Sequence, residues 1–332
     1  MMKHARLGKT ELTVSALSLG TMTFGNEADE VTSHQLLDAY VDAGGNVIDT
    51  ADRYSMGVSE EIIGRWLKRS GHRDRVVLAT KARFPMARGS GLHPSYLRGA
   101  IEDSLSRLEV DTLDIFQPHA FDPSVHPSEW LGLMKELIDE GKVRFLGVSN
   151  FLGYQLQLTL DVAHYEKLPV VASLQAQYNL LDRQIDIEIL EICRRYDIPL
   201  LPWSPLGRGW LTGKYRRDHK PSSDSRSDNN ALRFIDSFEK RNVERTHAIL
   251  EAVKVVADEQ GASMAQVSLA WLRQHPQIAS VILGARNLTQ LRDNLASAAV
   301  TLTDGQWSSL EVASRPNIPD YPYGFMDLMG GR

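Results

Sequence analysis

The stretch Val47-Ile48-Asp49-Thr50-Ala51-Asp52-Arg53-Tyr54 begins with two β-branched apolar residues and ends in acidic, basic and phenolic ones. Two later apolar runs end in the same way: Lys81 follows residues 76–79, and His119 follows residues 113–116. Near-continuous apolar runs are typical of strands that are buried on both faces of a parallel sheet. Because parallel strands bring their carboxyl ends to one edge, we expect Asp49, Tyr54, Lys81 and His119 to lie close together.

Short apolar runs of this kind recur eight times, and longer amphipathic segments separate them. The eight runs cover residues 16–20, 47–50, 76–81, 113–117, 144–149, 174–178, 199–203 and 280–283. The segments with helical spacing cover residues 33–43, 59–68, 94–108, 128–139, 153–166, 185–195, 243–259, 263–274 and 288–298. The count and even spacing favour a closed (β/α)₈ TIM barrel over a doubly wound sheet. In such a barrel the functional residues occupy the carboxyl ends of the strands.

Several segments lie outside the repeat. Residues 5–15 are predicted to form an N-terminal hairpin, one extra helix precedes the eighth strand, and another helix follows Thr303 and Asp304. Residues 216–242 begin with a stretch rich in Ser, Asp, Asn and Arg, which predicts a loop on the active face. Residues 315–332 form a Pro- and Tyr-containing tail. We interpret residues 1–332 as a single barrel domain.

Composition excludes several classes of protein. The chain has 332 residues, with 42 acidic against 37 basic side chains and a net charge of −5, which argues against general nucleic-acid binding. No apolar run approaches the roughly 20 residues that span a bilayer. The N-terminus leads into no apolar signal core, so we expect a cytoplasmic protein. Cys193 is the only cysteine and is expected to be a small buried side chain.

The four polar residues suit proton transfer. A free tyrosine has a pKa near 10. A neighbouring Lys81 ammonium favours the phenolate and makes Tyr54 a better acid, while Asp49 holds the ammonium in place. His119 could hydrogen-bond the reacting oxygen. The alternative for Asp49 and Lys81 alone is a buried ion pair that fixes the register of two strands. The histidines have no zinc-ligand spacing, and we expect no metal.

A set of short motifs supports a family resemblance. They are Leu19-Gly20-Thr21-Met22, Asp49-Thr50-Ala51-Asp52-Arg53-Tyr54, Ser59-Glu60-Glu61-Ile62-Ile63-Gly64, Ala79-Thr80-Lys81, Gln117-Pro118-His119, Gly147-Val148-Ser149-Asn150, Gln177-Tyr178-Asn179-Leu180-Leu181, Trp203-Ser204-Pro205-Leu206-Gly207-Arg208-Gly209, Leu211-Thr212-Gly213-Lys214-Tyr215 and Gly284-Ala285-Arg286. With these motifs the chain resembles the aldo-keto reductase superfamily over nearly its whole length. The residues in these motifs are most similar to those of the bacterial and potassium-channel-β-like branches.

The resemblance implies an NADP(H)-dependent enzyme that reversibly reduces small aldehydes and ketones. Tyr54 would be the general acid, Lys81 and Asp49 would tune it, and His119 would orient the carbonyl. Two alternatives stay open: a slow redox-sensing subunit that holds NADP(H), and an NAD-preferring alcohol or sugar dehydrogenase. Neither the physiological substrate nor the oligomeric state has a signature in the sequence.

The resemblance also implies which residues bind the cofactor. Gly20, Thr21 and Met22 would lie near the nicotinamide ribose, Ser149, Asn150 and Gln175 would hold the carboxamide, Trp203 would stack on the ring, Ser204, Pro205, Leu206, Gly207, Gly209 and Lys214 would cover the pyrophosphate, and Gly284, Arg286, Gln290 and Asn294 would hold the adenosine end. Arg286 would take the 2′-phosphate, because arginine suits bidentate phosphate contacts and a helix N-terminus is predicted beside it. Each residue also has a structural alternative: Ser149 and Asn150 could cap the next helix, Trp203 could pack in the core at a strand end, and Arg286 could be solvent-exposed.

The substrate pocket would have an aromatic lining. The expected side chains are Met22, Phe24, Tyr54, Phe84, His119, Phe121 and Phe151, with residues of the 216–240 loop and of the tail. Pro118 precedes His119 directly, where relatives often carry an aliphatic residue. Because proline cannot donate to a ladder, we expect the strand to end at Gln117.

Overall fold

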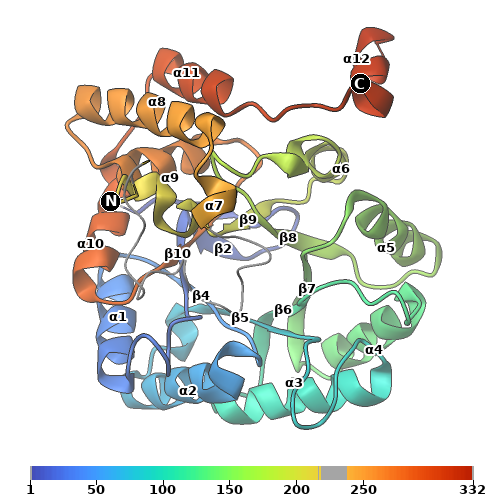
Figure 1. Ribbon diagram of the computed structural model, residues 1–332. Coiled ribbons are helices and arrows are strands. Elements are labelled where there is room, and N and C mark those ends of the chain that lie inside the picture. The colour runs from blue at the N-terminus through green and yellow to red at the C-terminus, as the bar shows by residue number, and fades with distance from the viewer. Residues whose placement is uncertain (1, 216, 218–237, 331–332) are drawn as a thin grey trace.

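Eight parallel strands surround a central axis in the computed structural model, which describes residues 2–215, 217 and 238–330 (Figure 1). The strands are β3 (Leu17–Gly20), β4 (Val47–Asp49), β5 (Val77–Ala82), β6 (Leu113–Pro118), β7 (Val143–Ser149), β8 (Val171–Gln177), β9 (Leu200–Trp203) and β10 (Val281–Gly284). They pair in the order β10-β3-β4-β5-β6-β7-β8-β9. Backbone bonds from Leu200 to Gln277 and from Ala279 to Leu200 connect β9 to the segment before β10. The predicted (β/α)₈ barrel is confirmed, and all eight predicted strands are present within a few residues of their expected bounds.

Helices form the outer layer of the barrel (Figure 1). They are α1 (Glu30–Asp42), α2 (Val58–Ser70), α3 (Pro94–Leu108), α4 (Pro127–Asp139), α5 (Gly153–Tyr165), α6 (Ile189–Tyr196), α8 (Glu244–Gln260), α9 (Met264–Gln274), α10 (Leu288–Ala296) and α11 (Asp304–Ser314). Ser263 caps α9 as predicted, in a reciprocal pair with Gln266. α2 differs from its prediction, since it begins one residue before Ser59. The Ser59 hydroxyl is buried and donates to Thr21 instead of capping the helix.

The prediction that the strand before His119 ends at Gln117 is wrong by one residue. β6 runs through Pro118, which lies opposite Ala82 of β5. The ladder continues because the backbone N–H of His119, and not that of residue 118, donates to the Ala82 carbonyl at 3.0 Å. Proline therefore costs no ladder hydrogen bond at this register, and His119 is fixed directly beyond the strand end.

A hairpin covers the amino-terminal end of the barrel. It is made of β1 (His4–Arg6) and β2 (Thr13–Ser15), as predicted. Its apolar side chains pack against inward-facing strand residues in a cluster separate from the main core. The cluster contains Leu7, Leu12, Val14, Val47, Val77, Ala79, Ile115, Leu201 and Ile282. One end of the barrel is thus filled with hydrocarbon, as in other parallel barrels.

The extra segments take different positions. The predicted 216–242 loop lies outside the described residues except for Arg217 and residues 238–242. Of these, α7 (Phe238–Arg241) places the Phe238 ring on that of Trp210, with centroids 5.4 Å apart. The tail ends in α12 (Phe325–Leu328), which stands away from the barrel in Figure 1. No helix among the described residues is long and apolar enough to cross a membrane.

Candidate active site

A buried ion pair lies at the carboxyl end of two adjacent strands. The Lys81 ammonium on β5 is fully buried and donates to Asp49 Oδ1 on β4 at 2.7 Å. It also donates to the Thr50 carbonyl at 2.7 Å and to the Tyr54 hydroxyl at 3.3 Å. Both charged side chains point inward because they share a face with Val47 and Val77 of the apolar cluster, at the two-residue period of a strand.

Asp49 receives further donors from across the barrel. Gln175 of β8 donates its side-chain amide to Asp49 Oδ2 at 2.7 Å, and Gln117 of β6 approaches the same oxygen at 3.5 Å. Burial alone would lower the pKa of Lys81, but Asp49 and Tyr54 raise it above its ordinary value. The lysine is therefore charged, and Asp49 keeps it so.

Tyr54 follows β4 on a short 3₁₀ turn (Tyr54–Gly57) and faces His119. Their ring centroids lie 5.9 Å apart in an edge-on arrangement. Burial raises the pKa of Tyr54, and the Lys81 ammonium lowers it only in part. The sequence argument predicted the lowering effect and missed the larger effect of burial. Tyr54 therefore carries its proton at neutral pH.

His119 is a neutral imidazole. Burial, and then the charge of Lys81, lower the pKa of His119 to about 2. Its Nδ1 is buried and has no hydrogen-bond partner among the described residues. Its ring lies 4.7 Å from that of Phe84, which follows β5. The imidazole can therefore hydrogen-bond a substrate oxygen without adding charge to the site.

Asn150 and Trp203 are joined at the ends of β7 and β9. Asn150 has a left-handed backbone, with φ of 56°, and its side chain accepts a hydrogen bond from Trp203 Nε1 at 3.0 Å. The same amide donates to the His119 carbonyl at 3.0 Å. The alternative that Ser149 and Asn150 cap α5 is wrong, because the N-cap of that helix is Leu152. Trp203 is half-buried, so part of its indole is open to a ligand.

A tight turn with several left-handed backbone conformations follows β9. Ser204, Gly207, Arg208 and Gly209 all have φ between 52° and 93°. Lys214 lies against Gly209: a Cβ on this glycine would stand 2.6 Å from Lys214 Cε. Pro205 and Leu206 complete the turn. The Gly207 and Gly209 N–H groups donate to the Ser204 and Leu206 carbonyls within the turn, so the group that this turn holds ready for an anion is the Lys214 ammonium.

The residues predicted for the adenosine end meet at the start of α10. Asn287 caps this helix, Gln290 Oε1 accepts from the Arg286 N–H at 3.0 Å, and the Asn294 amide donates to the Gly284 carbonyl at 3.3 Å. The Arg286 guanidinium is paired with Glu27, with Nε to Oε2 at 2.8 Å. Arg286 is partly exposed, so the alternative of a solvent-exposed arginine stays open.

Comparison with known proteins identifies the family. The model of the aldo/keto reductase family matches residues 16–315. The chain is 31% identical to protein Tas of Escherichia coli over 93% of its own length and 97% of that protein, and 33% identical to the uncharacterized oxidoreductase YrpG of Bacillus subtilis over 91% and 92%. It is 34% identical to a probable voltage-gated potassium channel subunit β of rice over 90% and 92%. The chain belongs to the aldo/keto reductase family. The predicted family and branch are confirmed.

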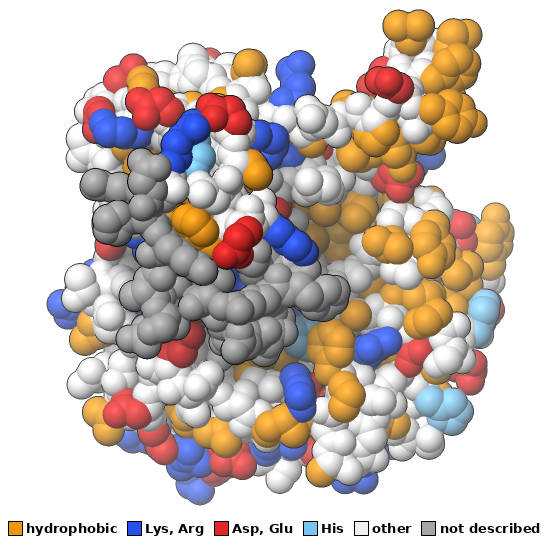
Figure 2. All heavy atoms as spheres, viewed as in Figure 1, with side chains coloured by type: hydrophobic (Ala, Val, Ile, Leu, Met, Phe, Trp, Pro, Cys, Tyr) orange, Lys and Arg blue, Asp and Glu red, His pale blue; other side chains and the backbone are white. Residues whose placement is uncertain are grey.

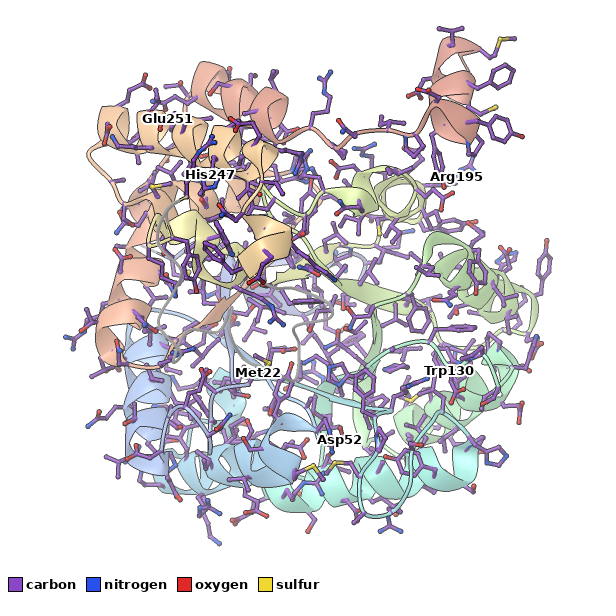
Figure 3. The ribbon with its side chains drawn as sticks, in the orientation of Figure 1. Met22, Asp52, Trp130, Arg195, His247 and Glu251 are labelled. Atoms are coloured by element: carbon purple, nitrogen blue, oxygen red, sulfur yellow. The ribbon has the colours of Figure 1, made fainter. Side chains whose placement is uncertain are left out.

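Two of the predicted substrate residues of this aldo/keto reductase are in the core. Phe24 is fully buried and Phe151 is 2% exposed, and both belong to the main hydrophobic cluster. Their assignment to an open pocket is wrong, because a spacing argument cannot tell which face of a loop points inward. Phe84 and Phe121 are half-buried, and Met22 is 51% exposed near the centre of Figure 3. Gly20 packs closely beside Ile282 and leaves no room for a side chain, and Thr21 is buried.

Asp52 is a polar residue of this site to which no role was assigned from the sequence. It is 1% exposed, and neither carboxylate oxygen has a hydrogen-bond partner in the described part of the chain. Figure 3 shows it beside α2 and α3. Burial, and then the charge of Glu60, raise the pKa of Asp52 to about 7. Glu60 is itself held by Arg107 at 2.7 Å and Thr80 at 2.5 Å. Its place within the quoted Asp-Thr-Ala-Asp motif was the one available signal.

Proposed function

We propose that this aldo/keto reductase uses NADPH to reduce aldehydes and ketones to alcohols, reversibly, and that residues 1–332 act as one functional unit. The observation that supports this best is the double contact of Lys81, which reaches both Asp49 and the Tyr54 hydroxyl from a fully buried position. A bound reduced nicotinamide supplies a hydride to the carbonyl carbon. The protein then has to deliver one proton to the carbonyl oxygen.

Tyr54 delivers this proton. Its raised pKa keeps the hydroxyl protonated before reaction, so it is available as an acid. As the proton leaves, negative charge develops on the phenol oxygen 3.3 Å from the Lys81 ammonium, which stabilises that charge in a site of low dielectric. Asp49 keeps Lys81 charged and oriented. The neutral His119 donates a hydrogen bond to the same carbonyl oxygen and fixes its direction.

The proposed cofactor residues fit a phosphorylated dinucleotide. The turn at Ser204–Gly209 would bring the Lys214 ammonium to a pyrophosphate, and the amino terminus of α10 would turn its first N–H groups to the adenosine end. Arg286 would take the 2′-phosphate, which would replace Glu27 as its anionic partner. Trp203 and Asn150 would hold the nicotinamide. Gln175, which donates to Asp49, would reach the carboxamide only with its remaining amide atoms.

A second candidate function is a slow redox-sensing NADP(H)-binding subunit. The observation that favours it is the similarity to probable potassium channel β subunits of rice and Arabidopsis thaliana, at 34% and 32% identity. The intact set of Asp49, Tyr54, Lys81 and His119 favours turnover over a purely structural role. An NAD-preferring dehydrogenase would differ from both candidates at Arg286, because NAD has no 2′-phosphate for this side chain to bind.

The test is a titration followed by turnover. Tryptophan fluorescence measures the binding of NADPH and NADH, and absorbance of the nicotinamide follows reduction of 4-nitrobenzaldehyde. We expect tighter binding of NADPH and turnover that falls by about 10²- to 10⁴-fold in Tyr54→Phe with NADPH binding retained. Tyr165→Phe, on an exposed side chain of α5, is the matched control. Tight binding without turnover on any carbonyl would favour the sensor, and binding of neither nucleotide would overturn the proposal.

A further inference from the structure

Arg83 occupies the first position after β5, two residues beyond Lys81. Its guanidinium carbon lies 5.5 Å from the centroid of the Phe84 ring, and the same ring lies 4.7 Å from that of His119. The guanidinium and the imidazole therefore both pack on Phe84. Basic and apolar side chains lie together below and to the right of the centre of Figure 2, on the face that contains these strand ends. A positive group is thus placed one aromatic ring away from the predicted position of the reacting carbonyl.

Arg83 lacks the partners that its neighbours have. Its Nε is buried without a hydrogen-bond partner, and its guanidinium makes no hydrogen bond or ion pair within the part of the chain that the structure describes. In the following loop and helix, Arg88 is paired with Asp103 at 2.8 Å, Arg98 with Glu136 at 2.7 Å and Arg107 with Glu60 at 2.7 Å. A buried unpaired donor is costly and rare in folded proteins, which indicates that a ligand supplies the acceptor.

The carboxylate whose charge interacts with Arg83 is not its hydrogen-bond partner. Asp122, on the loop after β6, is close enough for the two charges to interact. Its oxygens accept from other groups and not from Arg83: Oδ2 accepts from the Leu92 N–H at 2.9 Å and Oδ1 accepts from the Ser124 hydroxyl at 2.6 Å. Asp122 is a structural anchor of the loop that carries Arg83. The donors of the guanidinium remain available for a second anion.

Arg53 adds positive charge to the same loop. It directly precedes Tyr54, and one of its nitrogens, Nη1, donates to the Pro85 carbonyl at 2.8 Å and contacts Met56 Sδ. Its other guanidinium nitrogens make no hydrogen bond to the described residues. The charge of Lys81, by contrast, is neutralised by Asp49. Arg53 on the loop after β4 is thus joined through Pro85 to the loop after β5, on which the Arg83 guanidinium packs against Phe84.

We propose that Arg83, supported by Arg53, binds a carboxylate on the carbonyl substrate, so that the enzyme prefers aldehydes and ketones that carry an acid group at their far end. Guanidinium groups match carboxylates with two parallel charge-assisted hydrogen bonds. Phe84 would contact the chain or ring that separates the two ends of the substrate. The inference depends on the proposed reductase function and specifies its substrate class.

A pair of substrates that differ in charge tests this. We would measure kcat/KM for 4-carboxybenzaldehyde, which is anionic, and for methyl 4-formylbenzoate, its neutral ester. We expect the acid to be preferred by the natural chain, and the acid-to-ester ratio to fall by about ten- to hundredfold in Arg83→Met, the effect of losing a charge-assisted hydrogen bond. The ester value corrects each variant for changes in folding or in the chemical step. Arg88→Met, on the same loop but paired with Asp103, is the matched control and should leave the ratio unchanged.

Binding is measured separately from turnover. Titration calorimetry with 4-(hydroxymethyl)benzoate, the product of the acid, should show weaker binding to Arg83→Met than to Arg88→Met. An acid-to-ester ratio near one in the natural chain, or an equal ratio in both variants, overturns the anion site and leaves the reductase function intact. Reduction of neither aldehyde, with equal product binding by both variants, overturns both proposals.

Discussion

The two ends of the barrel are built from the same strands and have opposite contents. At the amino-terminal end, Val47, Val77 and Ile115 pack with the hairpin residues Leu7 and Leu12 in a hydrocarbon plug. At the other end the same inward faces carry Asp49, Lys81 and Gln117. Residues two positions apart on a strand point to the same side, so each of these strands contributes an apolar side chain at the amino-terminal end and a polar one at the carboxyl end.

The difference shows how one fold serves stability and chemistry at once. Burying hydrocarbon is favourable without further conditions, whereas burying charge is favourable only when each group is paired and hydrogen-bonded. Asp49 and Lys81 are paired with each other and have further hydrogen bonds: Asp49 accepts from the Gln175 amide, and Lys81 donates to the Thr50 carbonyl. At the polar end, stability therefore depends on each charged or hydrogen-bonded partner being present. At the apolar end it depends on the side-chain volume that fills the plug.

Removal of the Lys81 charge should have the largest effect on stability. Lys81→Met leaves Asp49 buried without its cation, and we expect a loss of about 3–5 kcal/mol in the free energy of unfolding, with loss of turnover. Urea denaturation measures it. The double variant Asp49→Asn, Lys81→Met should recover part of the stability and none of the activity. A double variant no more stable than the single one would show that the pair does not behave as a charge pair.

Truncation at the apolar end should cost stability alone. Leu7 is fully buried in the plug, and Leu7→Ala should lower the free energy of unfolding by about 3 kcal/mol through lost burial and a residual cavity. Turnover per folded molecule should stay the same, because the plug lies at the opposite end of the strands. The measurement is urea denaturation together with active-site-normalised kcat. A matched fall in kcat would mean that the two ends are coupled.

Asp52 tests the cost of an imperfectly paired charge at the polar end. Its pKa is raised to about 7 in the folded chain, above the ordinary carboxyl value of 3.8. The folded state therefore binds the proton more tightly, and this contribution to stability is present below pH 4 and is lost as the pH rises to 7. Asp52→Asn should stabilise the protein by about 2 kcal/mol at pH 8 and by little at pH 4. Melting temperatures at the two pH values measure this, and an equal shift at both would contradict it.

The smallest effect is expected at the rim, where charges are partly solvated. Glu27 competes with a 2′-phosphate for Arg286, so Glu27→Gln should tighten NADPH binding about two- to fivefold. NADH, which lacks the 2′-phosphate, is the matched control ligand and should bind as before. Tryptophan fluorescence gives both dissociation constants. Equal tightening for the two nucleotides would show that Glu27 acts on the shared part of the cofactor and not through Arg286.

Predictions that rested on the local pattern of apolar residues were confirmed. Predictions that depended on which residues surround a side chain in the folded protein were wrong. The apolar runs ending at Asp49, Lys81 and His119 located three strand ends, because buried parallel strands have a distinctive composition. Placement of Phe24 and Phe151 failed because loop residues have no period that tells inside from outside. The sequence also could not show that Arg83 lacks a partner among the described residues while Arg88 has one, since this depends on which carboxylates the loops bring near.

The amino-acid sequence by itself determined the barrel, the family motifs and the chemical types gathered at the strand ends, since strand periodicity and the order of elements are encoded locally. The tertiary structure alone decided the protonation states and the free donors. Burial raises the pKa of Tyr54 and lowers that of His119 to about 2, which makes the first a proton donor and the second a neutral hydrogen-bonding group. These properties come from desolvation and from charges on other strands, and neither is a property of a residue and its neighbours in the chain.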